Sequence, residues 1–228
     1  MPTDAPTAHR RVHVGIIAVL LLGFSTLRFP AGWYVAANLG ATVALLLLAG
    51  RLGLSRGELG LEAGPAGVGL RWGGWAALVA GLVLAGGAAI PALRPLFDDA
   101  RTAGIGPGLL AYRALVRIPL GTALLEEVAF RGVLFSAWRR RSTVRVAAVG
   151  SSIVFGLWHI RPAFDLLAEN DVSAGGPGRA LAVLAAVAGT TVAGVVFCWL
   201  RVGSGSLVAP YLAHAALNSL ATIAAFVV

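Results

Sequence analysis

The sequence predicts an all-α protein, a polytopic transmembrane helical bundle of about seven spans, within a range of six to eight. The chain has 228 residues, of which 58% are hydrophobic and only 12% are charged. A soluble domain carries about twice that charged fraction. Several apolar runs reach the length of about 20 residues that a helix needs to cross a bilayer. Because little remains outside these runs, residues 1–228 are predicted to form a single integral membrane domain.

The expected spans are separated by arginines, prolines and glycine-rich polar loops. They are, in order, residues 14–27, 33–50, 72–93, 119–138, 144–159, 179–200 and 204–228. The first resembles a signal peptide, but no small-x-small cleavage site follows it convincingly, so an uncleaved span is expected.

The fourth span is expected to begin at Pro119, since proline suits the first turn of a helix. Before it, Arg113 and Arg117 lie four residues apart and share a helical face. Residues 108–117 are therefore predicted to form a short interfacial helix. The arginines at 139–141 mark the end of the fourth span.

Prolines and one polar loop are expected to interrupt the last three spans. Arg161 and Pro162 are expected to stop the fifth span, and an acidic, glycine-rich loop is expected at 163–178. Pro210 is expected to kink the seventh span.

The distribution of arginine predicts the orientation. With seven spans and a cytoplasmic N-terminus, ten loop arginines fall on the cytoplasmic side and five on the other, which agrees with the positive-inside rule. The expected location is a bacterial cytoplasmic membrane. The net charge of +8 comes mostly from these loops, and with no platform of aromatic and basic residues we expect no nucleic-acid partner.

A pair of glutamates lies in the apolar fourth span. Ionisable residues at membrane depth are costly and are commonly functional. Glu127 and Arg131 are four residues apart, with the acid first, which favours an ion pair within one helix. Glu126 lies about 100° around the helix axis from Glu127. A carboxylate left without a counter-ion in a low-dielectric site suits a general base, although both glutamates could instead pair with arginines and only fix packing.

Two later spans carry titratable or amide side chains at helical spacing. Phe155 and His159 share a face of the fifth span, and His214 and Asn218 share a face of the seventh. Histidine and asparagine can bridge membrane helices without any catalytic role. The coincidence of three such segments favours a common site.

This set of side chains suits the activation of water. It includes no plausible activated serine, and Cys198, the only cysteine, lies in an apolar run and is expected to be a small core residue. Glu126 would take a proton from water, and histidine and asparagine donors would hold the oxyanion. Zinc held by Glu126, His159 and His214 is an alternative ligand set, but no H-E-x-x-H motif is present. No cofactor is therefore expected.

The three segments resemble the motifs of the CPBP family, the CAAX prenyl proteases and bacteriocin-processing enzymes also called the Abi family. Its pattern is E-E-x-x-x-R, then F-x-x-x-H, then H-x-x-x-N or D. All positions match in order, as Glu126-Glu127-x-x-x-Arg131, Phe155-x-x-x-His159 and His214-x-x-x-Asn218. The resemblance covers about residues 119–219, which are expected to form the catalytic core.

The resemblance implies an intramembrane endopeptidase of the glutamate type, a group formerly classed as metalloproteases. It assigns water activation to Glu126 and His159 and oxyanion stabilisation to His214 and Asn218. Glu127, Arg131 and Phe155 would support them. The implied partners are the lipid bilayer and a peptide or protein substrate, which is prenylated in eukaryotic relatives.

Two other functions fit the same composition. A non-catalytic membrane scaffold or immunity protein could keep this fold without using its polar residues. A transporter could use them as a proton relay, but the hydropathy pattern lacks inverted repeats. The positions of Glu126 and His159 along their spans place the site past the bilayer midplane, away from the arginines at 139–141, so it is expected to open outward.

Overall fold

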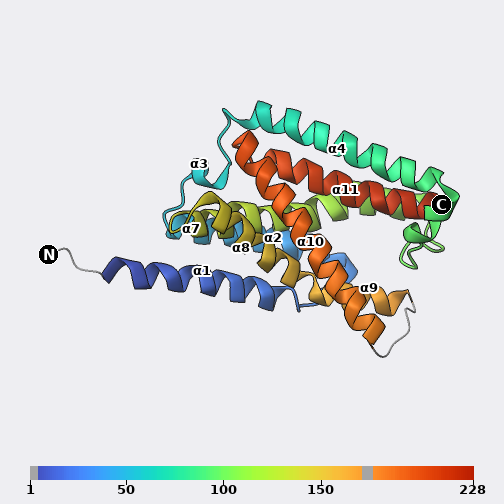
Figure 1. Ribbon diagram of the computed structural model, residues 1–228, viewed down its shortest axis with the longest axis horizontal. Coiled ribbons are helices and arrows are strands. Elements are labelled where there is room, and N and C mark those ends of the chain that lie inside the picture. The colour runs from blue at the N-terminus through green and yellow to red at the C-terminus, as the bar shows by residue number, and fades with distance from the viewer. Residues whose placement is uncertain (1–4, 171–176) are drawn as a thin grey trace.

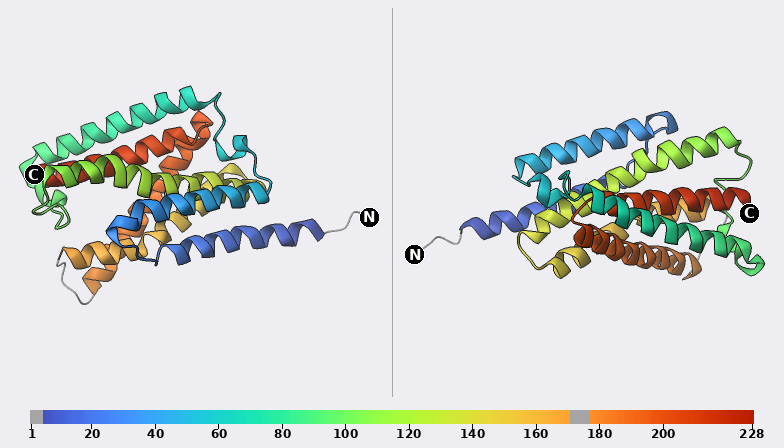
Figure 2. Two further views of the ribbon diagram at one scale, coloured as in Figure 1. Left: turned by 180° about the vertical axis from the view of Figure 1, so that it is seen from behind. Right: turned by 90° about the horizontal axis from the view of Figure 1, so that it is seen from above.

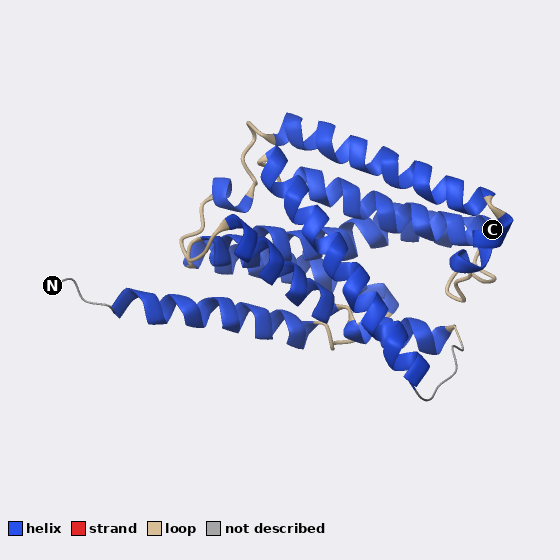
Figure 3. Cartoon of the chain, viewed as in Figure 1, coloured by secondary structure: helices blue, strands red, loops and turns tan. Residues whose placement is uncertain are grey.

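The protein is a bundle of helices in which α1, α4 and α11 run in similar directions and α10 crosses them obliquely, seen in Figure 1 and from two further sides in Figure 2. The computed structural model describes residues 5–170 and 177–228. Within those residues every regular element is a helix and no strand occurs (Figure 3). The elements are α1 (Ala5–Phe24), η1 (Ala31–Trp33), α2 (Tyr34–Arg51), α3 (Arg56–Leu59), α4 (Ala66–Ala89), η2 (Pro91–Phe97), α5 (Pro107–Tyr112), η3 (Arg113–Ala123), α6 (Leu124–Glu127), η4 (Val128–Leu134), α7 (Phe135–Arg139), α8 (Val144–Trp158), α9 (Ile160–Glu169), α10 (Pro177–Ser204) and α11 (Val208–Val227).

All seven predicted spans are helical, and within the part of the chain that the structure describes five helices are long and apolar enough to cross a membrane. These five are Ala31–Arg51, Ala66–Ala89, Pro107–Arg139, Gly178–Ser204 and Val208–Val227. The first and fifth predicted spans form shorter apolar segments. The apolar part of α1 covers only Val14–Phe24, and α8 has only 15 residues. The length of the apolar helical segment therefore separates these two from the other five.

The seven helices alternate in direction, which gathers the connecting loops at two ends and puts the termini at opposite ends (Figure 1). One end, here the arginine-rich end, holds the α2–α4, α7–α8 and α10–α11 connections, tied together by Arg140 and by Leu207. The opposite end holds the α1–α2, α4–α5 and α8–α10 connections, where Arg28 contacts Asp165. The count of loop arginines assumed that successive loops lie on alternate sides of the membrane, and the helices alternate in this way.

The expected break at Pro119 does not occur, because Pro107–Arg139 is one helix of 33 residues. Pro119 lies inside η3, which is π-helical. In a π-helix each N–H bonds to the carbonyl five residues earlier, so Pro119 leaves the Ala114 carbonyl without its donor. Ser219 Oγ on α11 donates to that carbonyl at 2.7 Å. The helix continues through the proline because a neighbouring helix supplies the missing hydrogen bond.

Other polar side chains from neighbouring helices hold the same long helix at its π-helical segments. Asn38 Nδ2 of α2 donates to the Gly121 carbonyl at 2.6 Å, and Ser151 Oγ of α8 donates to the Phe130 carbonyl at 2.7 Å. The residues whose carbonyls accept these bonds, Ala114, Gly121 and Phe130, are all buried. The long helix is therefore fixed against α2, α8 and α11, and the glutamate pair of α6 lies between its two π-helical segments.

The expected loop at 163–178 is wrong in its first half, which is helix α9. The chain bends at His159 and then resumes helical structure at Ile160. Pro162 cannot donate to the Trp158 carbonyl four residues earlier and its ring crowds that carbonyl, so the bend falls here and not after Pro162. The remainder of the predicted loop, 171–176, lies outside the described residues.

The short helix α3 is a strap across the arginine-rich end. Ser55 and Glu58 form a capping box at its start. Arg140 donates to both Glu58 carboxylate oxygens, at 2.5 and 2.7 Å, and Arg201 donates to the Glu58 carbonyl at 2.8 Å. Gly60 ends the helix with φ +73°, a conformation that glycine tolerates best. These contacts tie α3 to α7 and α10.

The contacts that hold α3 against α7 and α10 should weaken at acidic pH. Hydrogen bonding from Arg140, and then from Ser55, lowers the pKa of Glu58 from 4.5 to about 2. The stability that Glu58 contributes is therefore complete above pH 4.5 and is lost as the pH falls through about 2. In Glu58→Gln we expect thermal unfolding in detergent to depend less on pH between 4.5 and 2 than in the wild type. Equal slopes for the two proteins would show that Glu58 is not linked to folding.

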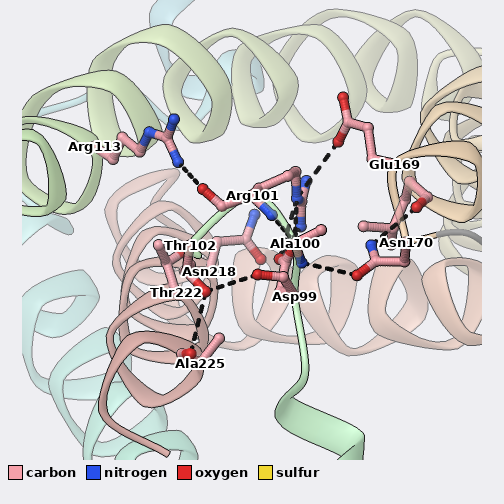
Figure 4. A network of polar contacts seen from close by, with 11 residues as sticks. Asp99, Ala100, Arg101, Thr102, Arg113, Glu169, Asn170, Asn218, Thr222 and Ala225 are labelled. Carbon is pink, nitrogen blue, oxygen red and sulfur yellow. Dashed lines mark hydrogen bonds and ion pairs between the residues drawn. The ribbon is translucent and has the colours of Figure 1, made fainter. Parts of the chain in front are cut away.

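The opposite end is closed by the loop at 98–104, shown with its polar contacts in Figure 4. Arg101 pairs with Asp99 at 2.6 Å, and the Ala100 N–H donates to Asn170 Oδ1 at 2.8 Å. Thr102 Oγ1 donates to the Ala225 carbonyl at 3.1 Å. The loop thus joins the ends of α9 and α11.

Candidate functional site

The polar residues of the three motifs come from three helices that meet in the buried core. Glu126 and Glu127 belong to α6, His159 lies at the junction of α8 and α9, and His214 belongs to α11. Both glutamates and His214 are buried. The side chain of His159 is 21% exposed, which makes it the most accessible of the four.

Small residues allow α8 and α10 to approach closely next to the second motif. A Cβ added at Gly156 would lie 2.0 Å from Thr191 Oγ1 and 2.8 Å from the Val187 carbonyl oxygen. A Cβ at Gly194 would lie 2.9 Å from Ser152 Cβ. The helices can therefore pack at this distance only with glycine at these positions, and Phe155 and His159 are positioned by that contact.

Glu127 is held by two partners in the interior, as predicted for its pairing with Arg131. Its Oε1 accepts a hydrogen bond from Arg131 Nη1 at 3.0 Å and lies 2.8 Å from His214 Nδ1. The Arg131 guanidinium also lies over the rings of Phe155, at 4.1 Å, and Phe197, at 5.0 Å. Glu127 and Arg131 are both 0% exposed, so the ion pair is protected from water on all sides.

The contacts of the two histidines fix which ring nitrogen carries the proton. His159 Nδ1 lies 2.8 Å from the Phe155 carbonyl oxygen, which can only accept, so Nδ1 is the donor. His214 Nδ1 lies equally close to the Glu127 carboxylate, which also only accepts. In the neutral form each ring therefore carries its free lone pair on Nε2.

Both Nε2 atoms face the same carboxylate oxygen. His214 Nε2 lies 3.7 Å and His159 Nε2 lies 3.8 Å from Glu126 Oε2. These separations are longer than a hydrogen bond. Glu126 Oε2 is buried and makes no hydrogen bond to any part of the chain that the structure describes. A carboxylate oxygen and two imidazole nitrogens thus converge with no protein donor between them.

The other oxygen of Glu126 has a partner that the sequence did not suggest. Trp158 Nε1 donates to Glu126 Oε1 at 3.3 Å. A buried indole N–H usually finds an acceptor. Because Trp158 directly precedes His159, that rule could have suggested an acceptor for its N–H within the site.

Asn218 lies one helical turn beyond His214 and is half-buried. Its carbonyl accepts a hydrogen bond from Thr222 Oγ1 at 2.9 Å, and Figure 4 shows it beside the loop at 98–104. Its side-chain amide makes no hydrogen bond to the described residues. The contacts therefore unite Glu126, His159 and His214, and leave Asn218 outside their cluster.

An apolar groove of about 560 Å³ lies beside the site, between α4, α10 and α11. Trp72, Trp75 and Trp199 line it, and Phe197 forms part of its wall. The Phe197 ring also stacks on the ring of His214, with centroids 4.9 Å apart. One aromatic side chain therefore separates the groove from the buried cluster.

Two imidazoles and a carboxylate are a known set of zinc ligands, and Glu126, His159 and His214 are the residues that would supply them. Across residues 5–170 and 177–228, however, no group of three or more His, Cys, Asp or Glu side chains is arranged as a metal site. The zinc alternative stays a prediction.

Comparison with known families places the site within a region that matches one family model. Residues 108–220 match the model of the type II CAAX prenyl endopeptidase Rce1-like family, and this region contains all three motifs. No curated protein and no solved structure matches the chain. With its apolar helices long enough to cross a membrane, the chain is an integral membrane protein, and its residues 108–220 belong to the CPBP family of CAAX-protease-like membrane endopeptidases.

Proposed function

We propose that this protein is an intramembrane endopeptidase that hydrolyses peptide bonds of membrane-associated or lipid-modified peptides with a water molecule activated by Glu126. The observation that carries the proposal is the position of Glu126 Oε2, which is buried without a protein donor and faces two imidazole Nε2 atoms at 3.7 and 3.8 Å. A water molecule bound between these atoms could donate to the carboxylate and to one imidazole.

In the proposed reaction Glu126 acts as the general base. It accepts a proton as the water oxygen attacks the peptide carbonyl carbon, and it returns that proton to the nitrogen when the C–N bond breaks. His159, whose Nε2 lone pair faces the same space, helps to orient the water. The reaction consumes one water and leaves a new carboxyl and a new amino terminus.

His214 and Asn218 are proposed to stabilise the oxyanion. His214 can donate from Nε2 only when both of its nitrogens are protonated. Glu127 Oε1 lies 2.8 Å from His214 Nδ1 and holds the ring with Nε2 toward Glu126. Asn218 lies on the same face of α11, one turn further on, and its amide would have to turn toward the bound substrate to assist.

The apolar groove supports a substrate with a hydrocarbon chain. Its wall is shared with the site through Phe197, so a chain lying in the groove would bring the attached peptide close to His214. Within the bilayer the gain on binding is not removal from water but van der Waals contact of the chain with the tryptophan and aliphatic side chains that line the groove. We propose that the substrate is a peptide carrying such a chain or a membrane-embedded segment.

We propose that the N-terminus is cytoplasmic, in a bacterial cytoplasmic membrane, and that the site opens toward the opposite side. The arginine-rich end would then face the cytoplasm, as the positive-inside rule favours. Asp165 lies at the opposite end, where it pairs with Arg28. A cysteine placed at Asp165, in a Cys198→Ala background, should react with a membrane-impermeant maleimide from outside intact cells. Labelling only from the cytoplasmic side would reverse the orientation.

The proposed activity is tested by comparing cells that carry the wild type with cells that carry Glu126→Ala. Mass spectrometry of new protein termini should find fragments only with the wild type. Purified enzyme should then cleave the identified peptide in detergent or vesicles, and treatment with a zinc chelator decides between the two mechanisms. Cleavage that survives removal of bound metal supports the glutamate mechanism, and loss of activity with loss of stoichiometric zinc supports the metal alternative. Identical termini in both cells would favour a non-catalytic scaffold.

A further inference from the structure

The two oxygens of Glu126 lie in different environments. Oε1 accepts the hydrogen bond from the Trp158 indole, and Oε2 faces the imidazoles. A carboxylate whose oxygens were both free could rotate and present either of them. The indole N–H distinguishes the two, because it holds Oε1 and thereby aims Oε2 at the place proposed for water.

The indole is itself held by rings on two sides. Phe24 stacks on Trp158, with centroids 6.0 Å apart and an angle of 13° between the planes. Phe130 meets it edge to face at 5.4 Å and 82°. Trp158 is 6% exposed, so its ring has little room to turn. Aromatic contacts of this kind fix ring orientation as well as burying area.

These two rings come from different parts of the chain. Phe130 belongs to the same long helix as Glu126, within the region 108–220 that matches the family. Phe24 is the last residue of α1, far outside that region. The first helix, which matches nothing in the family model, therefore contacts the residue that contacts the proposed base.

We propose that Trp158 is a positioning residue for Glu126, and that α1 contributes to the working site through Phe24. This inference rests on the proposed function. The row Phe24–Trp158–Glu126 passes from the lipid-facing first helix to the buried carboxylate. Its effect is to reserve Oε2 for the bound water, and α1 is thereby part of the catalytic unit as well as of the bundle.

The test compares steady-state kinetics of Trp158→Phe with those of Trp138→Phe. Trp138 is a half-buried indole packed against Gly150, and it serves as the matched control for loss of a tryptophan. Removing one hydrogen bond to a charged group should lower kcat by about tenfold to a hundredfold in Trp158→Phe, with KM within about threefold. Trp138→Phe should keep the wild-type kcat.

A second pair of variants separates positioning from packing. Site-specific replacement of Trp158 by benzothienylalanine keeps the ring shape and removes only the N–H, so kcat should fall as in Trp158→Phe. Wild-type kcat with this isostere would overturn the proposal. Phe24→Ala should lower kcat about two- to tenfold, and much less when Trp158→Phe is already present. An equal loss in both backgrounds would show that Phe24 does not act through Trp158.

The activity of Glu126→Gln separates a failure of the proposed positioning by Trp158 from a failure of the proposed function. If Glu126→Gln remains fully active on the same substrate, the proposed base is wrong whatever Trp158 does. If Glu126→Gln is inactive and the isostere is fully active, the base stands and only its positioning by the indole is wrong.

Discussion

Glu126→Gln should lower kcat by about a thousandfold or more, since a general base contributes about 10²–10⁴ and a glutamine cannot accept the proton. Glutamine keeps the size of the side chain, and its carbonyl oxygen can still accept from Trp158 Nε1. The variant should also melt at the same temperature as the wild type or higher, because it removes a buried charged oxygen that lacks a donor. Single-turnover cleavage and thermal unfolding in detergent measure both effects.

The control is Glu62→Gln, which makes the same change at an exposed glutamate in the loop before α4. It should leave both kcat and the melting temperature unchanged. Wild-type turnover by Glu126→Gln would contradict the mechanism. A large fall in melting temperature would instead give Glu126 a structural role.

Arg131→Ala should cost about 3–5 kcal/mol of stability, the range for breaking a buried ion pair by removing one partner. The change leaves Glu127 charged and buried, and it removes the guanidinium that covers the rings of Phe155 and Phe197. Chemical unfolding in detergent measures the loss. Replacing both partners, as in Glu127→Leu with Arg131→Met, should recover part of it, because two apolar residues of similar size need no counter-charge.

The double variant should nevertheless stay inactive. His214 Nδ1 has Glu127 Oε1 as its partner, so an apolar residue at 127 removes the group that orients the ring. If Arg131→Ala has the same free energy of unfolding as the wild type and yet has no activity, Arg131 belongs in the reaction and its assignment as a supporting residue is wrong.

The sequence predicted the helical segments because long apolar runs and loop arginines report directly on membrane crossing. It also predicted the pairing of Glu127 with Arg131, since side chains four residues apart lie on the same face of a helix. These inferences depend only on local spacing. The convergence of Glu126, His159 and His214 was expected from the coincidence of three polar segments and from the family resemblance, because no local rule says which helices are neighbours.

The features that the sequence did not predict depend on contacts between distant segments. Pro119 continues a helix only because Ser219, a hundred residues later, donates to the freed carbonyl. Trp158 could have packed as an ordinary core residue, and its role depends on Glu126 lying across from it. Asn218 shares a helical face with His214, but spacing along one helix could not tell that its amide would lie outside the cluster.

The shortness of α8 has a consequence for how water reaches a hydrolytic site within a bilayer. Its 15 residues span about 22 Å at 1.5 Å per residue, which is less than a hydrocarbon core of about 30 Å. A helix too short for its membrane is accommodated by local thinning of the bilayer. His159, the most exposed of the clustered residues, directly follows the end of α8, and α9 then begins at Ile160. Hydrophobic mismatch at α8 would thin the bilayer locally and bring the aqueous interface close to the His159 imidazole. The thinned lipid would thereby give water, the second substrate of the hydrolysis, access to the site.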